Sequence, residues 1–492
     1  MPSTRRTSSA GAKTSRRAKS TDTSQGQGKN SERTGKISDL SKKSSKQKHE
    51  RLPLNEVPTQ VLDVYVFGTN CYGELGLGDL TKKSEILRPV LNAKLAANTV
   101  GVVHVAVGGV HSAALTRDNK ILTWGVNDEG TLARDTKPDE PADADNARTA
   151  NGDTESDDSD DDEVAINPKE ATPMPVDSAL FSERTVFTQL AASDSATFAL
   201  TADGLVYGWG TFRGANGSIG FAATKKQEQR VPVLIQDVPP VIKIVAGAQH
   251  VLALTSTGTV FSWGCDEQHQ LGRRRASRHH DSHPLVPEPC ALPTGVSDIG
   301  VGLYHSFAVY PNGTVYAWGS NNFGQTGVSM SAGLNDADVA YPTEVRWLRK
   351  NVSVVSIFGG KDHSMAITDD GRCFIWGRID NKALGIGLEH VSPSDIIHDQ
   401  YDRPRILKQP TLLEGIKGKI IFATAGTDHS FVITESGNAY SWGFNAQSQA
   451  GQPGIDEVER PTLLESKYIK GKKLVAAAAG GQFSIVLGLA EE

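Results

Sequence analysis

The sequence contains no run of about 18 apolar residues, so it offers no helix that could span a membrane. Its N-terminal part also lacks the apolar stretch of a secretory signal peptide, and we therefore expect the protein to stay inside the cell and to bind no membrane. Cysteine is scarce, and the four cysteines lie far apart without a C-x-x-C pair: Cys71, Cys265, Cys290 and Cys373. That spacing indicates isolated reduced thiols rather than a zinc site or a disulfide framework.

The motifs of nucleotide-binding enzymes are also missing. One glycine-rich stretch, GELGLG at 73–78, has the spacing G-x-x-G-x-G inside an all-β pattern, with no helix start after it. No G-x-x-x-x-G-K-[ST] match exists. We therefore expect this chain to bind no nucleotide, cofactor or metal and to carry out no covalent chemistry.

Basic residues are concentrated at the N-terminus. The net charge is −6, yet residues 1–51 hold 14 Lys and Arg against 4 Asp and Glu. The same segment is rich in Ser, Thr and Gly, and Ile37 and Leu40 are its only large aliphatic residues. Such a composition cannot bury enough apolar surface to offset chain entropy. We predict a disordered basic tail over residues 1–56.

Acidic residues are concentrated in one internal stretch. Of the 25 residues from Asp139 to Glu163, 12 are acidic, and we predict a disordered acidic loop over residues 135–172. A solvated insertion that tunes solubility is one interpretation. Contact with a basic partner, or phosphorylation at Ser156 or Ser159, is the other.

Residues 57–490 repeat one unit, which we interpret as the blade of a propeller. Each copy reads as two short alternating strands joined by a turn such as D-G, T-G or N-G, which is typical of a β-hairpin. In six copies a fixed distance of thirteen positions separates a histidine slot from a tryptophan: His111 to Trp124, Ala196 to Trp209, His250 to Trp263, His305 to Trp318, His363 to Trp376 and His429 to Trp442. Because the five histidines follow the scaffold period, we expect buried structural groups rather than metal ligands.

The two ends of the repeat are complementary. The first unit, at 63–78, has only the second half of the pattern, with Phe67 in the tryptophan slot. The last unit, at 479–488, has only the first half, with Phe483 in the histidine slot. We therefore predict an all-β fold, a seven-bladed β-propeller in which N- and C-terminal strands share a blade. Such closure removes exposed sheet edges.

These units resemble the repeats of the regulator of chromosome condensation family, in a fungal-type form, over residues 57–488. The stretch GTFRGANGSIGF at 210–221 is similar to the segment that the founding member inserts as a wedge against the small GTPase Ran, and NDEGTLARDT at 127–136 is similar to its second blade. The resemblance implies a nuclear, chromatin-bound guanine-nucleotide exchange factor for Ran. A propeller scaffold without exchange activity is the alternative, because the same repeat also occurs in ubiquitin-ligase arms and photoreceptors.

The resemblance assigns the wedge to six residues directly after the Trp209-Gly210 pair: Phe212, Arg213, Gly214, Ala215, Asn216 and Gly217. The glycines let a backbone approach the partner, while the phenylalanine and arginine supply apolar area and a charge-assisted donor. We expect deletion of 212–217 to abolish exchange and leave the fold intact. A slightly long hairpin without a partner is the alternative.

The resemblance also implies a docking face around the wedge. Asp194 matches an aspartate of the family, whereas Gln249 and Cys71 stand where the founding member has aspartate, and Lys361-Asp362-His363 replaces a histidine run. We assign to this face Asp194, Gln249, Arg273, Asp362 and His363.

Two basic clusters suggest chromatin binding. The tail arginines Arg5, Arg6, Arg16 and Arg17 suit a nuclear import receptor and DNA phosphates, and the lack of tail aromatics predicts sequence-nonspecific contact. In RRRASRHH at 273–280, the family resemblance implies that Arg274, Arg275 and Arg278 contact the acidic patch of nucleosome histones. Solvated charge is the alternative for this second cluster.

Overall fold

The computed structural model describes residues 53–81, 83–137, 166–224, 226–273, 283–334 and 337–491. The chain divides into two units, Met1–Arg51 and Leu52–Glu492, and the architecture below is that of the second. Several expectations fall outside the described residues: most of the tail and of the acidic loop, and the basic residues Arg5, Arg6, Arg16, Arg17, Arg274, Arg275 and Arg278.

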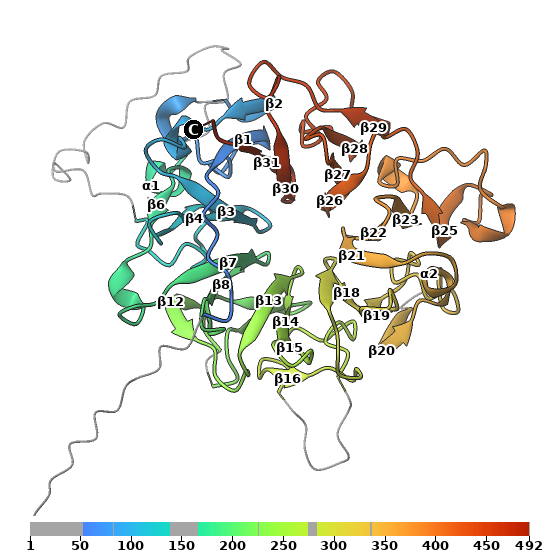
Figure 1. Ribbon diagram of the computed structural model, residues 1–492, viewed down its shortest axis with the longest axis horizontal. Coiled ribbons are helices and arrows are strands. Elements are labelled where there is room, and N and C mark those ends of the chain that lie inside the picture. The colour runs from blue at the N-terminus through green and yellow to red at the C-terminus, as the bar shows by residue number, and fades with distance from the viewer. Residues whose placement is uncertain are drawn as a thin grey trace, which may run out of the picture. The chain divides into compact units, whose positions relative to one another are not determined.

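Seven antiparallel sheets surround a central axis, and the strands nearest to that axis are β3, β7, β13, β17, β21, β26 and β30 (Figure 1). We number the sheets as blades one to seven along the chain. Each blade contacts the next, and the seventh contacts the first, so the ring is closed. The predicted all-β seven-bladed propeller is therefore confirmed.

The first blade joins the two ends of the repeat. Its strand order is β2-β1-β31-β30, with β1 (Leu62–Thr69), β2 (Glu85–Leu91), β30 (Leu474–Ala479) and β31 (Phe483–Leu489). Strands β1 and β31 pair antiparallel from Leu62 opposite Leu489 to Gly68 opposite Phe483. The complementary halves seen in the sequence thus form one sheet, as predicted.

The other six blades each begin at the axis and end at the rim. Blade two has β3 (Val102–Val107), β4 (His111–Thr116), β5 (Ile121–Gly125) and β6 (Met174–Pro175). Blade three has β7 (Phe187–Ala192), β8 (Ala196–Thr201), β9 (Val206–Gly210) and β12 (Gln229–Leu234). Blade four has β13 (Val241–Ala246), β14 (His250–Thr255), β15 (Val260–Gly264) and β16 (Glu288–Pro289).

Blade five has β17 (Asp298–Val301), β18 (His305–Val309), β19 (Val315–Ser320) and β20 (Asp338–Glu344). Blade six has a fifth strand at the rim, in the order β21 (Val354–Gly359), β22 (His363–Thr368), β23 (Cys373–Arg378), β25 (Pro404–Leu412) and β24 (Ile396–His398). Blade seven has β26 (Ile420–Ala425), β27 (His429–Thr434), β28 (Ala439–Phe444) and β29 (Glu457–Leu463).

Helices are few and short in the described part of the chain. They are α1 (Pro168–Ala171), α2 (Arg346–Asn351) and the 3-10 turns η1 (Gly78–Leu80), η2 (Ala93–Leu95), η3 (Ser178–Leu180), η4 (Asp380–Lys382) and η5 (Pro393–Asp395). Helix α1 lies within the stretch predicted to be disordered, where Asn167 caps it by accepting from Lys169 N–H at 3.0 Å. The predicted loop boundaries therefore extend too far, because short capped turns carry little compositional signal.

The predicted tail also extends too far. The backbone N–H groups of Leu54 and Asn55 both donate to the Ala202 carbonyl, at 2.8 and 3.0 Å. The Asn55 side-chain amide donates to the carbonyls of Thr201 and Val241, each at 2.9 Å. Residues 54–55 are thus fastened to blades three and four, through polar contacts that no local composition predicts.

The repeat histidines connect neighbouring blades, and we call each blade-to-blade contact a seam. At five seams the Nε2 atom of a buried histidine lies 2.7–2.9 Å from a hydroxyl of the next blade: His111 with Thr197, His250 with Ser306, His305 with Ser364, His363 with Ser430 and His429 with Ser484. Burial lowers the pKa of His250, His305 and His429 to about 3. The rings are therefore neutral near pH 7, and the predicted structural role is confirmed.

The hydroxyl group at a seam also donates a hydrogen bond to a backbone carbonyl of the neighbouring blade. Ser306 Oγ donates to the Gln270 carbonyl at 2.9 Å, and Trp318 Nε1 donates to the same oxygen at 2.8 Å. Because the hydroxyl proton is used in this bond, His250 donates its own Nε2–H to Ser306. Histidine, hydroxyl and tryptophan thus form one polar network that joins two blades.

Candidate functional site

The seam between blades three and four lacks this polar network. Ala196 occupies the histidine slot, Val251 stands where the other seams have a hydroxyl, and Trp263 Nε1 has no hydrogen-bond partner. In the other blades a glycine precedes the histidine slot by three positions; a Cβ at Gly247, for example, would lie 2.3 Å from His250 Cε1. Here Ser193 replaces that glycine, because the small side chain of Ala196 leaves room for it.

Aromatic packing replaces the polar network at this seam. The Phe198 ring lies 6.1 Å from Phe212 and 6.0 Å from Trp263, and Phe212 lies 6.0 Å from Phe221. A two-stranded hairpin consists of β10 (Phe212–Gly214) and β11 (Gly217–Gly220). Phe212 is its first residue, and Phe221 follows directly after its last. The hairpin therefore has an apolar base inside the core.

Phe212 requires a correction to the sequence interpretation. Its side chain is 0% exposed, so it cannot offer apolar area to a partner, and its removal would not leave the fold intact. The sequence interpretation placed Phe212 at the surface because the chain usually leaves the core after a Trp-Gly pair. The missing histidine and hydroxyl of this seam leave space that the ring fills.

The rest of the hairpin projects into solvent. Arg213 pairs with Ser218 and Gly214 with Gly217, which leaves Ala215 and Asn216 as an exposed two-residue tip. Gly217 has φ of +106°, a value that glycine adopts without strain. The hydroxyls of Thr211 and Ser218 lie 2.9 Å apart across the base. Five of the six residues assigned to the wedge thus lie on one exposed hairpin.

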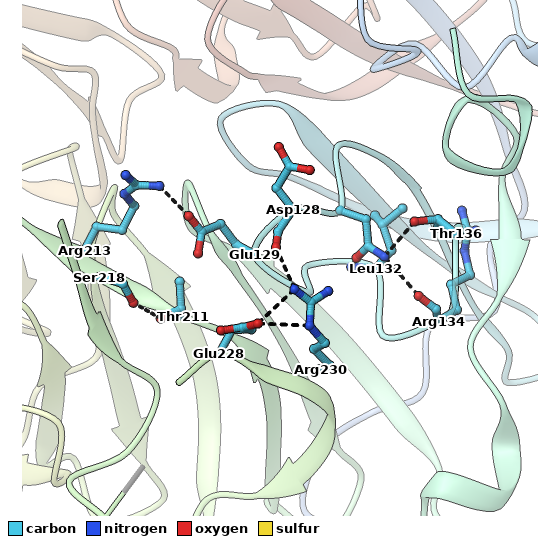
Figure 2. A network of polar contacts seen from close by, with 11 residues as sticks. Asp128, Glu129, Leu132, Arg134, Thr136, Thr211, Arg213, Ser218, Glu228 and Arg230 are labelled. Carbon is cyan, nitrogen blue, oxygen red and sulfur yellow. Dashed lines mark hydrogen bonds and ion pairs between the residues drawn. The ribbon is translucent and has the colours of Figure 1, made fainter. Parts of the chain in front are cut away.

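Three neighbouring side chains hold the hairpin in place. Gln249 Oε1 accepts from the Arg213 backbone N–H at 2.7 Å. The Arg213 guanidinium forms an ion pair with Glu129 of the loop after β5 (Figure 2). The Ala215 N–H donates to both carboxylate oxygens of Glu267, at 3.0 and 2.9 Å. Glu129 and Glu267 were missed in the sequence, although each lies in the loop that follows a Trp-Gly pair.

The Glu129 loop is itself fixed by blade three. Arg230 of β12 donates to the Asp128 carbonyl at 3.0 Å and to Glu228 Oε1 at 2.8 Å, which Figure 2 shows beside the Arg213 pair. Part of the Arg230 side chain passes over Gly130, where a Cβ would lie 2.9 Å from Arg230 Cγ. Loops of blades two, three and four thus support one hairpin.

Asp194 lies next to this assembly and has an unusual protonation equilibrium. Burial raises its pKa to about 6, while a hydrogen bond with the Gln249 side chain acts in the opposite direction. Its backbone N–H donates to the Ala248 carbonyl at 3.0 Å. Gln249 therefore contacts both Asp194 and the hairpin, and the structure brings together these three predicted elements.

Asp362 lies on the same face, in blade six. The loops after the first and third strands of every blade leave at one side of the ring, which places Asp194, Gln249, Asp362 and the hairpin on a common face. Asp362 is 8% exposed and pairs with Arg378 at 3.2 Å. The Arg378 guanidinium in turn lies 4.6 Å from the centroid of the Phe323 ring.

His363 and Arg273 do not belong to an exposed docking face. His363 is completely buried, and its Nε2 lies 2.7 Å from Ser430 Oγ in the next blade. Arg273 is 9% exposed and donates to the carbonyls of Ser262 and Val286, the latter at 2.7 Å. Both assignments are corrected, because each side chain satisfies buried polar groups of the scaffold.

The position of Arg273 within the repeat indicates that its side chain points inward. Arg273 follows Trp263 by ten positions, as Arg134 follows Trp124 and Gln452 follows Trp442. Arg134 donates to the Thr123 carbonyl at 2.9 Å, and Gln452 donates to the Leu463 carbonyl at 3.1 Å. A polar side chain in this slot therefore joins the third strand to the outer segment of its own blade.

The described residues contain no group of three His, Cys, Asp or Glu side chains placed to hold a metal ion. Within the same ranges, no helix reaches the length and apolarity that crossing a membrane requires. All four cysteines are free thiols, and Cys71 is the one that is partly exposed.

Comparison with known proteins agrees with the closed ring and its repeat. The family model described as RCC1-like domain matches residues 63–486. The chain belongs to the RCC1-like domain family. Protein pim1 of Schizosaccharomyces pombe is 39% identical over 435 residues, which cover 88% of this chain and 76% of pim1. The guanine nucleotide exchange factor SRM1 of Saccharomyces cerevisiae is 34% identical, over 87% of this chain and 88% of SRM1.

A solved structure has the same fold. The crystal structure of Prp20p from Saccharomyces cerevisiae, studied with its binding to Gsp1p and histones, superposes with a TM-score of 0.77 at 31% identity. The alignment covers 89% of this chain and 93% of Prp20p. Yeast RCC1 (Prp20) bound to Kap60 gives the same TM-score over 93% of this chain.

Proposed function

We propose that this RCC1-like protein is a guanine-nucleotide exchange factor for the small GTPase Ran, and that it releases GDP without covalent chemistry. The observation that carries the proposal is the exposed hairpin between blades three and four, whose base is buried and whose tip is held by neighbouring loops. The exchange activity named for SRM1 and the Gsp1p binding studied for Prp20p support it.

Exchange requires a difference in binding rather than a reaction. A factor that binds the nucleotide-free GTPase more tightly than the loaded form weakens nucleotide binding by the same factor. Each tenfold acceleration of release requires a barrier about 1.4 kcal/mol lower. A rigid hairpin suits this task because it loses little conformational entropy when it presses against the phosphate-binding region.

The charges around the hairpin fit the same mechanism. The Glu129 carboxylate pairs with Arg213 of the hairpin, and the Asp194 carboxylate lies next to Gln249. Carboxylates repel nucleotide phosphates and attract the lysine that a GTPase phosphate loop uses to hold them. We therefore propose that Arg213, Gly214, Ala215, Asn216 and Gly217 contact the phosphate-binding region. Asp194 and Gln249 lie on the surrounding docking face, and the nearly buried Asp362 supports that face by holding Arg378.

The test is GDP release from Ran loaded with a fluorescent GDP analogue. In the test variant, Gly214–Gly217 is replaced by an Asn-Gly turn, which keeps Phe212 and Phe221 and therefore the core. We expect release to slow at least about 100-fold, equivalent to ~2.7 kcal/mol, with little change in thermal stability. The control is Glu414→Ala, an exposed side chain in the loop after β25, which leaves the ring on the face opposite the hairpin. Wild-type exchange by a folded shortened variant would refute the role of the hairpin, and failure of the unmodified protein to accelerate GDP release would leave the scaffold function as the better account.

We further propose a nuclear, chromatin-associated location, with histones, DNA phosphates and an import receptor as partners. The histone binding studied for Prp20p and the complex of yeast RCC1 with Kap60 support this part. The tail arginines Arg5, Arg6, Arg16 and Arg17 would serve import and DNA, and Arg274, Arg275 and Arg278 the histones. The role of the acidic loop, in solubility or in binding a basic partner, is a separate proposal.

One described surface also suits DNA. A hollow of about 580 Å³ on the face opposite the hairpin is lined by exposed basic residues that form no ion pair within the described part of the chain: Arg88, Lys467, Lys470 and Lys473. Duplex DNA binding should weaken with salt by a slope of about 0.9 per phosphate contact. We expect the double substitution Lys470→Glu and Lys473→Glu to reduce this slope. Replacement of Arg274, Arg275 and Arg278 by alanine should reduce nucleosome capture. Unchanged values would exclude the respective surfaces.

A further inference from the structure

The hairpin of β10 and β11, which we call the exchange hairpin, lies at one of the two seams in the described part of the chain that lack the histidine–hydroxyl network; at the other, between blades one and two, Phe483 occupies the histidine slot. Its aromatic base is anchored by Phe212, but the tip extends beyond the core, where apolar packing no longer restrains it. The position of the tip therefore depends on polar contacts from outside blade three.

Glu267 supplies the most direct of these contacts. It belongs to the loop after β15 in blade four, and both of its carboxylate oxygens accept from the Ala215 N–H, at 3.0 and 2.9 Å. A Cβ at Gly214 would lie 2.6 Å from Glu267 Oε1, so the absence of a side chain there lets the carboxylate reach the tip. A hydrogen bond from a backbone N–H to a carboxylate is about twice as strong as a neutral one.

The other contacts are made to Arg213, two positions earlier and on β10, where the backbone N–H donates to Gln249 Oε1 at 2.7 Å and the side chain forms an ion pair. Arg213 pairs with Glu129 of blade two, and the two side chains are 49% and 27% exposed. Exposed pairs of long side chains contribute about 0–1 kcal/mol and leave the backbone free to move. The Glu267 contact instead holds a backbone atom of the tip itself.

We infer that Glu267 is a positioning residue of the exchange hairpin, which holds the Ala215-Asn216 tip in the conformation that enters the GTPase. The inference rests on the proposed exchange function and extends it to a residue of a neighbouring blade. Without the carboxylate, the tip samples other conformations, and the apparent rate falls with the fraction of competent molecules. The docking face is unchanged, so affinity for the GTPase stays nearly the same.

The test measures exchange by Glu267→Ala as a function of exchange-factor concentration. We expect the maximal rate to fall about tenfold, equivalent to ~1.4 kcal/mol, while the half-saturating concentration changes less than about twofold. Glu267→Gln keeps an acceptor oxygen for the Ala215 N–H and should retain at least about a third of the wild-type rate. Hydrogen exchange of the Ala215 amide should accelerate in Glu267→Ala. Glu414→Ala, an exposed side chain on the opposite face, serves as the matched control.

The outcomes separate this inference from the proposed function. Failure of the unmodified protein to accelerate GDP release would refute the function itself, and wild-type exchange by the shortened hairpin would refute the role of the hairpin. An inactive shortened hairpin together with wild-type kinetics of Glu267→Ala would refute only the positioning role. A raised half-saturating concentration with an unchanged maximal rate would assign Glu267 to GTPase contact instead, and would also overturn the inference.

Discussion

Truncation of Phe212 distinguishes a hairpin anchored in the core from one that binds its partner through an exposed ring. The ring is completely buried and lies 6.0–6.1 Å from the rings of Phe198 and Phe221. Large-to-small substitutions at such positions cost about 3–5 kcal/mol, because both transfer energy and packing are lost. We therefore expect Phe212→Ala to lower the free energy of unfolding by about that amount.

The measurement is urea-induced unfolding followed by tryptophan fluorescence, with GDP release from Ran recorded on the same samples. Arg213→Ala is the matched control, since it removes an exposed side chain of the adjacent position and should cost less than about 1 kcal/mol. Phe212→Leu keeps most of the apolar volume and should lose clearly less stability than Phe212→Ala.

The opposite pattern would refute the reasoning. If Phe212→Ala unfolded at the wild-type urea concentration and yet failed to release GDP, the ring would have to contact the GTPase. The aromatic cluster at this seam would then not be the base of the hairpin.

Three further predictions concern titration and the buried arginine. The five seam histidines have folded pKa values of about 3 to 4, below the ordinary 6.5. The free energy of unfolding should therefore be highest above pH 6.5 and should fall as the pH decreases towards 4, by about 1.4 kcal/mol per pH unit for each histidine. His305→Gln should make this pH dependence less steep in thermal unfolding. Ionisation of Asp194 destabilises the folded protein as the pH rises, because burial raises the pKa of Asp194 to about 6. Asp194→Asn should therefore stabilise the protein at pH 7.5 by up to ~3 kcal/mol. A free energy of unfolding equal to or below that of wild type at this pH would contradict the burial argument. Arg273→Ala leaves buried carbonyls without donors and should cost about 2–4 kcal/mol in chemical denaturation while the exchange rate per folded molecule is unchanged; reduced exchange in a stable variant would return Arg273 to the docking face.

The repeat made the fold predictable from sequence. The thirteen-position register from the histidine slot to the tryptophan marks the second and third strands of each blade, from His111–Thr116 through Ile121–Gly125 onwards. Strand alternation and turn residues are local properties, so the sequence carries them directly. The complementary halves around Phe67 and Phe483 likewise predicted the shared blade.

The candidate site was predictable only in part. The sequence located the hairpin after Trp209, because an insertion changes the register locally. The burial of Phe212 depends instead on Ala196 and Val251, which lie in other strands and come together only across a seam. The inward course of Arg273 was visible in principle, as a slot shared with Arg134, but its direction follows from which carbonyls lack donors.

The sequence by itself thus determined the number of blades, their closure and the place of the insertion, because periodicity and turn chemistry are encoded within each repeat. The tertiary structure alone decided which residues of the hairpin are core and which are surface, and which neighbours hold it. Glu129 and Glu267 are 138 positions apart and reach the same hairpin only because three blades meet there. Contacts of that kind depend on the closed ring, which brings distant loops together on one face.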